Sequence, residues 1–299
     1  MESDAPLLSV DLRVDYPNKP QTLRAVSFQI NQGEVLGLVG ESGSGKSTIA
    51  LAILGLLGLK GGRAIGHIWF RGRDLMVASE RDMRRVRGRE IGLVLQSPLS
   101  SLNPALKIGT QLAEAWRAHA TGTKAELAMA IDRALSSVGL PADKEFCSRY
   151  PSQVSVGQAQ RVLIAMAVMH SPALLLADEP TSALDAITQA EIMKLFTQLN
   201  RKMGSAVLYI SHDLLSVASL CNRIAILHDG EIVECGSVEM VLTRPRHAYT
   251  QQLLASAPWP LRSGIPSPLP TYRLGKTTGP RFFPVADKRD HRKSVPDST

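Results

Sequence analysis

The sequence predicts an α/β fold in which helices cover a mostly parallel sheet. Short aliphatic runs are each followed by a turn signal, among them Val35–Val39, Ile91–Leu95 and Val207–Ile210. Continuous apolar runs of this length are typical of strands buried on both faces. Helical patterns such as Ser47–Leu57 and Ile187–Met203 lie between them. This alternation favours parallel strands that are joined by helices.

The composition is that of an ordinary globular protein. The chain has 299 residues, of which 44% are hydrophobic and 20% are charged, which suits one large domain with a tail or two modest domains. Its 3 cysteines are too scattered for a disulfide framework or a zinc site, so we expect buried thiols and a reducing cytosol. The uncharged stretch Val162–Ala177 contains His170 and Pro172, which predicts a helix, a break and a strand rather than a membrane span.

The positive charge is concentrated near the C-terminus. Residues 260–299 hold eight Lys or Arg and three Asp, which accounts for +5 of the formal net charge of +7. Prolines also crowd this part of the chain. A basic, proline-rich tail is more often solvated than a nucleic-acid site. We therefore expect residues 259–299 to be weakly ordered, and we expect no nucleic-acid partner.

A glycine-rich segment follows the strand predicted for Val35–Val39. It reads Gly40-Glu41-Ser42-Gly43-Ser44-Gly45-Lys46-Ser47-Thr48 and fits the phosphate-loop pattern. Glycines let consecutive backbone N–H groups point at phosphate oxygens, and the following helix adds its positive dipole end. In such a loop Lys46 reaches the β- and γ-phosphates and Ser47 binds Mg²⁺. The strand before the loop and the helix after it favour this interpretation over a flexible glycine turn.

Two carboxylates follow the apolar run Leu174–Ala177. Asp178 would hold Mg²⁺ through its water shell, and Glu179 would polarise the attacking water. Phosphoryl transfer depends on such positioning and charge neutralisation. A strand that ends in Asp-Glu is weak evidence alone, because many strands end in an acidic turn. Together with the phosphate loop, the pair predicts an ATP-hydrolysing site.

These motifs and four others resemble those of ATP-binding subunits of ABC transporters, over about Leu7–Pro258. Tyr16 lies upstream of the phosphate loop, where the family places an aromatic residue that stacks on adenine. Gln96 follows its own strand, as does the family's glutamine that senses Mg²⁺ and γ-phosphate. Asp185 ends a match to the D-loop, and His212 matches the switch histidine that contacts γ-phosphate. Each residue alone also fits a structural role, so the resemblance depends on their order and spacing.

A further motif, the family's signature Leu-Ser-Gly-Gly-Gln, is only partly kept. This chain has Val154-Ser155-Val156-Gly157-Gln158, so Ser155, Gly157 and Gln158 match. In the family this segment begins a helix and contacts γ-phosphate bound by the opposite subunit. Val156 replaces a glycine, and a β-branched residue is stiff and disfavours positive φ. Either the backbone here is ordinary and Val156 is tolerated, or the contact is weakened. Our hypothesis is that Val156 lowers turnover at that composite site.

The resemblance implies a P-loop NTPase core with a mostly parallel sheet, an antiparallel β subdomain and an inserted helical subdomain. It implies an ATP-binding domain over residues 1–258, with the helical insertion at about 97–170. ATP and Mg²⁺ are the implied cofactors. The implied partners are transmembrane permease subunits, a second ATP-binding subunit and, indirectly, a solute-binding protein. We favour a heterodimer, peripheral on the cytoplasmic face of the inner (plasma) membrane.

Within the family, the chain resembles the oligopeptide, dipeptide and nickel importers. The phosphate loop is one marker, and Gln96–Pro104, Ala177–Asp185 and Pro245–Leu254 are others. This group commonly carries a C-terminal cysteine cluster that binds an iron–sulfur centre. No cysteine follows Cys235, and such a centre needs thiolate ligands, so we expect no iron–sulfur cluster. Peptides, nickel chelates and oligosaccharides all remain open as the transported solute.

Three other interpretations fit parts of the sequence. ABC ATPases of DNA repair usually insert a long coiled coil before the signature, but Ser47–Ser155 shows no sustained heptads. Those of translation usually carry two ATPase domains in one chain. A phosphate-loop kinase or GTPase would not account for the signature, D-loop and switch histidine together. A regulatory subunit that does not hydrolyse ATP conflicts with intact Lys46, Asp178 and Glu179.

Overall fold

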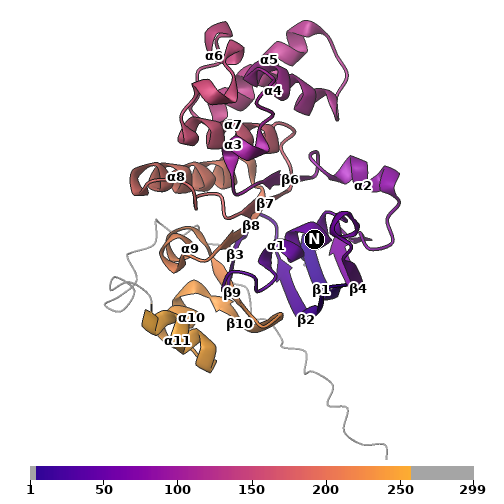
Figure 1. The fold of residues 1–299 in the computed structure, drawn as a ribbon, viewed down its shortest axis with the longest axis vertical. Coiled ribbons are helices and arrows are strands. Elements are labelled where there is room, and N and C mark those ends of the chain that lie inside the picture. The colour runs from indigo at the N-terminus through magenta and orange to yellow at the C-terminus, as the bar shows by residue number, and fades with distance from the viewer. Residues whose placement is uncertain (1–4, 257–299) are drawn as a thin grey trace, which may run out of the picture. The chain divides into compact units, whose positions relative to one another are not determined.

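A mixed ten-stranded sheet runs through the part of the chain that the computed structural model describes, residues 5–256 (Figure 1). Its order is β5-β4-β1-β2-β10-β9-β3-β8-β7-β6. The strands are β1 (Leu8–Tyr16), β2 (Lys19–Ile30), β3 (Val35–Val39), β4 (Arg63–Phe70), β5 (Arg73–Asp74), β6 (Ile91–Val94), β7 (Leu174–Asp178), β8 (Ala206–Ser211), β9 (Arg223–His228) and β10 (Glu231–Ser237). The predicted α/β class is confirmed.

Helices occupy most of the remaining described chain. They are α1 (Lys46–Ile53), α2 (Glu80–Val86), α3 (Pro98–Ser101), α4 (Ile108–Arg117), α5 (Lys124–Ser137), α6 (Lys144–Ser148), α7 (Val156–Val168), α8 (Ala186–Met203), α9 (Leu214–Leu220), α10 (Val238–Thr243) and α11 (Ala248–Ser256). Short 3₁₀ turns cover Leu57–Lys60 and Pro151–Gln153. None of the helices in residues 5–256 is long and apolar enough to cross a membrane.

The parallel half of the sheet holds the strands that the apolar runs predicted. β3 pairs in parallel with β8 and β9, and β7 pairs in parallel with β6 and β8. All residues of β3 and β8 are buried. This burial explains why their sequences are continuously apolar instead of alternating.

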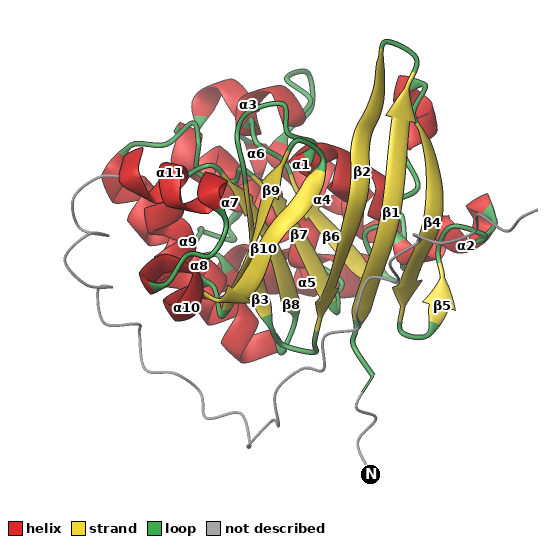
Figure 2. Cartoon of the chain, turned by 90° about the horizontal axis from the view of Figure 1, so that it is seen from below, coloured by secondary structure: helices red, strands yellow, loops and turns green. Residues whose placement is uncertain are grey.

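The other half of the sheet is antiparallel. β1 lies between β2 and β4 and pairs antiparallel with both, and its buried residues largely alternate with more exposed ones. A single parallel pair, Glu231 with Ala25, joins β10 to β2 and so connects this half to the rest. Figure 2 shows the long strands β1, β2 and β4 side by side at one end of the sheet.

Helices α3 to α7 lie between β6 and β7 in the chain and gather at one end of the structure (Figure 1). α7 contacts α3, α4 and α5. Apolar side chains of α5 and α7, such as Leu135 and Val162, join the core cluster that also contains Phe196 of α8. This packing fixes the helices against one face of the parallel strands.

One predicted helix boundary is wrong. The helix predicted over Ser47–Leu57 ends at Ile53, because Gly55 takes a φ of 63° that a helix cannot continue. The signature segment begins α7 at Val156, where the Ser155 side chain caps the helix. The predicted tail, residues 259–299, lies outside the described residues.

Candidate active site

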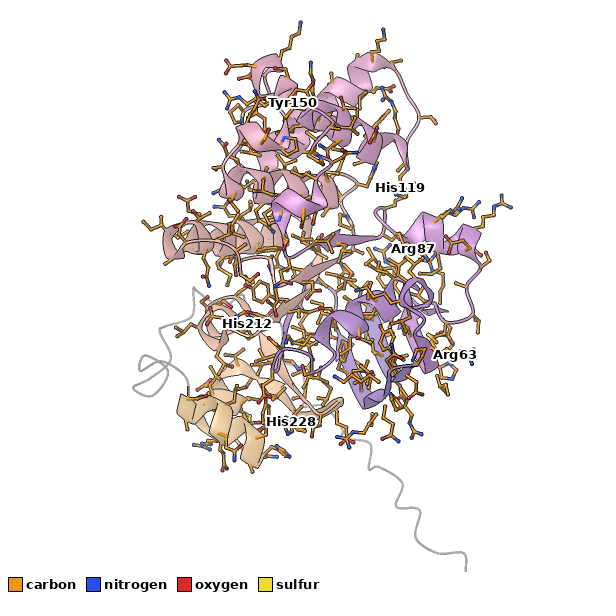
Figure 3. The ribbon with its side chains drawn as sticks, viewed as in Figure 1. Arg63, Arg87, His119, Tyr150, His212 and His228 are labelled. Carbon is orange, nitrogen blue, oxygen red and sulfur yellow. The ribbon has the colours of Figure 1, made fainter. Side chains whose placement is uncertain are left out.

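Several of the predicted site residues meet at one edge of the parallel half of the sheet. The phosphate loop follows β3, Asp178 ends β7, His212 follows β8, and Gln96 lies two residues after β6. Carboxyl ends of neighbouring parallel strands lie at the same edge, which is where α/β proteins bind ligands. Figure 3 shows His212 near the middle of the structure, beside α9.

Close packing requires glycine at two positions of the phosphate loop. Gly45 has a φ of 109°, and a Cβ there would lie 2.5 Å from the Cδ2 atom of Leu23. A Cβ on Gly40 would lie 2.2 Å from the carbonyl oxygen of Leu227. The loop therefore passes against the backbone at the end of β9, which fixes it on the sheet.

Lys46 is the first residue of α1, and its side chain is buried inside the loop. Its Nζ donates hydrogen bonds to the carbonyl oxygens of Gly40 at 2.8 Å and of Glu41 at 2.9 Å. Burial lowers the pKa of Lys46, and the charges of Glu179, Asp178 and Glu41 oppose that shift. The Nζ also lies 3.9 Å from Oε1 of Glu179. The lysine thus links the loop to the acidic end of β7.

Glu179 is in contact with three of the predicted site residues. Besides its contact with Lys46, its Oε2 accepts a hydrogen bond from Nε2 of Gln96 at 3.0 Å. The same oxygen lies 3.2 Å from Nδ1 of His212. The backbone of Glu179 has a φ of 46°, which is unfavourable for a non-glycine residue and occurs most often at functional sites. Its N–H donates to the carbonyl of Ile210 at 2.9 Å, and this bond holds the turn in place.

Asp178 has the properties of a cation ligand. Its Oδ1 is buried and has no hydrogen-bond partner within residues 5–256. Burial raises the pKa of Asp178, whereas the Ser47 hydroxyl and the Lys46 charge lower it. An unpaired buried carboxylate oxygen beside a serine hydroxyl fits the oxygen ligands that Mg²⁺ prefers.

A cavity of about 400 Å³ lies over these groups. It is lined by Tyr16, Lys19, Thr22, Ser42, Gly43, Gly45, Lys46, Ser47, Thr48, Gln96 and Glu179. The lining does not include the predicted site residues Gly40, Glu41, Ser44, Asp178 and His212. Tyr16 lies at the rim from which the first β-hairpin extends.

The sequence did not predict two of the residues that line this cavity, Lys19 and Thr22. Lys19 donates from its Nζ to the carbonyl of Gly43 at 2.8 Å, and Thr22 is 8% exposed. Both belong to β2, just after the turn that pairs Tyr16 with Lys19. The only signal was their closeness to Tyr16 in sequence, and no motif marks them.

The signature residues lie elsewhere in this chain. Ser155 and Gln158 form a capping box: the Gln158 N–H donates to Ser155 Oγ at 3.2 Å, and the Ser155 N–H donates to Gln158 Oε1 at 3.1 Å. Val156 is the first residue of α7, has no positive φ, and is 37% exposed. A Cβ on Gly157 would lie 2.7 Å from Cγ2 of Thr188. The backbone at Val156 is therefore ordinary, and a Cβ at position 157 would require the Thr188 side chain to shift.

The predicted D-loop residue Asp185 caps α8. Its Oδ1 accepts from the N–H groups of Ile187 and Thr188, both at 3.0 Å. The backbone hydrogen bond from Thr188 is the main reason that the pKa of Asp185 is lowered. Neither Asp185 nor any of the three matching signature residues lines the cavity.

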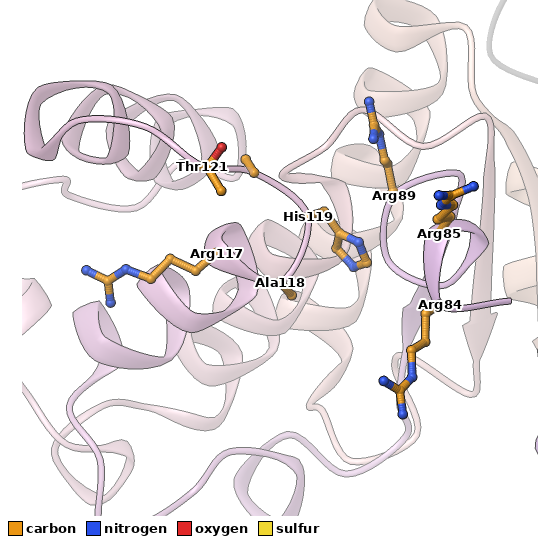
Figure 4. A pocket seen from close by; sticks show the side chains of 8 residues that line it. Arg84, Arg85, Arg89, Arg117, Ala118, His119 and Thr121 are labelled. Atoms are coloured by element: carbon orange, nitrogen blue, oxygen red, sulfur yellow. The ribbon is translucent and has the colours of Figure 1, made fainter. Parts of the chain in front are cut away.

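A second cavity of about 340 Å³ is strongly basic (Figure 4). Arg84, Arg85 and Arg89 line it on one side, and Arg117 and His119 line it near the end of α4. Burial lowers the pKa of His119, and the nearby His170 and Arg89 lower it further. None of the predicted site residues lines this cavity, so it is separate from the phosphate loop.

Comparisons with known proteins agree with this geometry. Residues 23–182 match a family model described as ABC transporter. The chain is 42% identical over 244 residues to the oligopeptide transport ATP-binding protein OppD of Bacillus subtilis, covering 81% of this chain and 68% of that protein. It is 41% identical over 256 residues to the dipeptide transport ATP-binding protein DppD of Escherichia coli. The match covers 84% of this chain and 78% of that protein. A solved post-hydrolysis dimer of the ATP-binding cassette MJ0796, bound to ADP and Pi, matches with a TM-score of 0.66 and 26% identity over 77% of this chain and 98% of that one.

Proposed function

The chain belongs to the family of ABC transporter ATP-binding proteins, and we propose that its phosphate-loop cavity binds Mg²⁺ with ATP and hydrolyses the nucleotide to drive import of peptides or a similar small solute. The observation that carries this proposal is the position of Glu179. Lys46, Gln96 and His212 surround it at 3.0–3.9 Å, at the edge of the cavity. Such convergence of a cation, an amide and a histidine on one carboxylate suits phosphoryl transfer.

Each cavity residue has a role that its position supports. Lys46 exchanges the carbonyls of Gly40 and Glu41 for the β- and γ-phosphates of ATP, because its ammonium group needs acceptors whichever ligand is present. Backbone N–H groups of residues 42–48 surround the phosphates. The ring of Tyr16 stacks on adenine at the rim of the cavity.

Ser47, Asp178 and Gln96 are the residues that would hold Mg²⁺, which neutralises phosphate charge when it is bound. Glu179 orients and polarises the attacking water, since its carboxylate lies where a water next to the γ-phosphate can donate to it. His212 holds that carboxylate from the opposite side from Lys46 and contacts the γ-phosphate. Electrostatic positioning of this kind, without a covalent intermediate, accounts for the catalysis.

A second copy of the ATPase fold completes the site. Ser155, Gly157, Gln158 and Asp185 lie away from the cavity of their own chain, at the N-termini of α7 and α8. Helix N-termini suit phosphate groups. We therefore assign these residues to the nucleotide of a facing subunit, so that ATP joins two subunits and hydrolysis releases them.

The remaining assignments follow from the family. We assign residues 1–258 to the ATP-binding domain, with the helical insertion at about 97–170 passing motion to transmembrane permease subunits. The names of the relatives favour peptides as the solute, while nickel chelates and oligosaccharides remain as alternatives. A heterodimer with a different ATPase chain is favoured, with a solute-binding protein as an indirect partner. The complex would place this chain on the cytoplasmic face of the inner membrane.

A pull-down from native membranes in mild detergent tests the transport role. The tagged full chain should recover two multi-span permease proteins and a second ATPase chain, identified by mass spectrometry. Recovery of only soluble partners, such as ribosomal or DNA-repair proteins, would contradict transport. Phosphate release by the purified chain and by Lys46→Ala tests the ATPase separately, because loss of the lysine should abolish hydrolysis whatever the partner is.

A further inference from the structure

The basic cavity of about 340 Å³ lies apart from the proposed ATP site and is close to it in volume. Arg84, Arg85, Arg89, Arg117 and His119 line it together with small neutral residues, and the lining contains no carboxylate. A hollow that is lined by charges of one sign concentrates their potential and attracts ions of the opposite sign. The composition of this cavity therefore favours an anionic ligand.

The two walls of the basic cavity are packed directly against each other. Gly88, in the turn before β6, has a φ of 75°, and a Cβ there would lie 2.7 Å from Nε2 of His119, just after α4. The Gly88 N–H donates to the carbonyl of Ile91 at 2.8 Å, which closes the turn. Nε of Arg87 donates to the carbonyl of Leu54 at 2.7 Å and joins the turn to the end of α1. The backbone on which the basic side chains stand is thus fixed.

The ring of His119 lies between the two groups of arginines (Figure 4). It makes an edge-to-face contact with His170, with 5.3 Å between ring centroids. Within residues 5–256 the ring forms no hydrogen bond, so its N–H is free to bind a ligand. The charge of Arg89 lowers the pKa of His119, as expected where positive charge is not balanced by a nearby carboxylate.

The arginine side chains are also free to bind a ligand. Arg89 and Arg117 form no ion pair and no side-chain hydrogen bond within the described part of the chain. Arg84 and Arg85 pair with carboxylates of their own helix at 3.4 and 3.7 Å, where all four side chains are more than half exposed. Exposed ion pairs of this kind contribute little to stability. Figure 4 shows Arg84 and Arg117 extending away from each other, as like charges do, and a multivalent anion would offset that repulsion.

The geometry of arginine favours a phosphate group as the anion. A guanidinium group presents parallel N–H donors that match two phosphate oxygens at once. A terminal phosphate has three such oxygens and up to two charges, so it can accept from several guanidinium groups and an imidazole together. A volume of about 340 Å³ is within the range of small-molecule sites. The cavity can thus hold a phosphate group with a small ester.

We propose that the basic cavity is a second anion site, which takes a phosphate-bearing ligand between Arg84, Arg85 and Arg89 on one side and Arg117 and His119 on the other. The phosphate belongs to a soluble ester or to the headgroup of an acidic phospholipid, which present the same group to the arginines. The first three residues precede the proposed helical insertion and the other two lie within it, so the bound phosphate would link the insertion to the rest of the domain. The site does not depend on the proposed ATP site.

Calorimetric titration of the full chain with inorganic pyrophosphate tests the proposal. Lys46→Ala is the background, because it removes the lysine through which the phosphate loop would bind the same probe. In that background, Arg89→Gln with Arg117→Gln removes two exposed, unpaired cations, so the fold should be kept. We expect pyrophosphate to bind at least roughly tenfold more weakly, the effect of one lost hydrogen bond to a charged group. The matched control, Arg13→Gln with Arg63→Gln, removes the same charge at residues that line neither cavity and should leave the affinity unchanged.

Vesicles of phosphatidylcholine and phosphatidylglycerol in equal parts identify the source of the phosphate. The basic tail is present in every variant, so its attraction to the vesicles cancels in the comparison. If co-sedimentation with the vesicles falls for Arg89→Gln with Arg117→Gln and not for the control, the ligand is a lipid headgroup. If only pyrophosphate binding falls, the ligand is a soluble phosphate ester. Identical behaviour of the two double variants towards both probes would overturn the proposal, would leave the cavity to an acidic partner protein, and would not affect the ATPase assignment.

Discussion

Glu179 combines a strained backbone with three polar neighbours. A non-glycine residue in the left-handed region costs about 1–3 kcal/mol, and such strain persists only where surrounding contacts determine it. Here the N–H bond to Ile210 and the contacts with Gln96 and His212 do so. The strain directs the carboxylate towards the cavity rather than along β7.

Replacing Glu179 by Gln should separate binding from hydrolysis. The amide keeps the size of the side chain but cannot polarise water as a carboxylate does. We expect ATP to bind with nearly unchanged affinity and hydrolysis to fall by roughly 10²–10⁴-fold, the usual range for a lost general base. Phosphate release and equilibrium binding measure the two effects. Glu145→Gln, at a 79% exposed side chain, is the control, and normal hydrolysis by Glu179→Gln would exclude Glu179 as the base.

Asp178 should destabilise the nucleotide-free protein at neutral pH. Its pKa is raised by burial, so the folded state holds a proton more readily than the unfolded chain, in which the pKa is near 3.8. The free energy of unfolding therefore falls as pH rises from 3.8 through the folded-state pKa, and the loss persists at higher pH. A neutral side chain at this position avoids that penalty.

Asp178→Asn should accordingly raise the Tm of the nucleotide-free chain at pH 7–8 while it abolishes Mg²⁺-dependent hydrolysis. About 1 kcal/mol corresponds to roughly 2–4 °C in a protein of this size. The gain should shrink as the pH approaches 3.8, because Asp178 is then protonated in both states. Thermal unfolding followed by circular dichroism at several pH values is the measurement, and a lower Tm for Asp178→Asn at pH 7 would show the charge to be stabilising.

At the scale of elements, α7 and α8 are packed against each other where the signature and D-loop begin. Gly157 lies directly on Thr188, and Nη2 of Arg161 donates to Glu191 Oε2 at 2.8 Å. The two helix N-termini that we assign to the facing nucleotide are thus held as one unit. A change in their spacing should alter both motifs together.

Gly157→Ala tests that packing. The new Cβ would approach Thr188 Cγ2 to 2.7 Å, so the Thr188 side chain or the helix must shift. We expect a loss of stability of about 1–2 kcal/mol, in the range for overpacked sites, and weaker ATP-dependent association. Gly58→Ala is the control, because a Cβ on Gly58 meets nothing within 4 Å. Chemical denaturation of both variants decides the point, and equal stability would show that α7 and α8 adjust freely.

Val156 lies at the N-terminus of α7, next to Gly157. The structure gives it an ordinary backbone at the first position of α7 and leaves its side chain partly exposed. Our hypothesis of lowered turnover thus depends on the side chain occupying space beside the facing nucleotide. Val156→Gly should raise the ATPase rate of the assembled complex by roughly threefold, which corresponds to under 1 kcal/mol in the barrier. An unchanged rate in the complex would refute the hypothesis.

At the scale of the whole molecule, we propose that each chain contributes half of two ATP sites. The cavity and the signature residues Ser155, Gly157 and Gln158 lie in different parts of the described chain, which is why the proposal assigns the signature to the nucleotide of a facing subunit. Glu179→Gln should therefore accumulate as a dimer with Mg²⁺–ATP and remain monomeric with ADP. Sedimentation of Glu179→Gln, both alone and together with its ATPase partner chain, measures the oligomeric state. If the variant stays monomeric with Mg²⁺–ATP in both experiments, the composite site is contradicted.

The sequence by itself determined the fold class, and it predicted most of the residues that the structure brings together at the proposed site. Each strand of the parallel half is a continuous apolar run, because both faces are buried, and the proposed catalytic residues follow at the strand ends. A strand and the residues that directly follow it can be predicted from a short stretch of sequence. Val35–Val39 with its glycine loop and Leu174–Asp178 with Glu179 are two examples. One helix limit was misjudged, because the apolar pattern of Ser47–Leu57 continues past Gly55, which ends the helix.

Only the tertiary structure decided which distant residues touch. Lys19 and Thr22 enter the cavity because β2 folds back on β1, and the ring of Tyr249, on α11, stacks on His228 at the end of β9. No periodicity or motif records these contacts, since they depend on how the ends of separate strands align in the sheet. The same holds for Gly157, because the side chain that limits the space beside it, Thr188, lies on another helix.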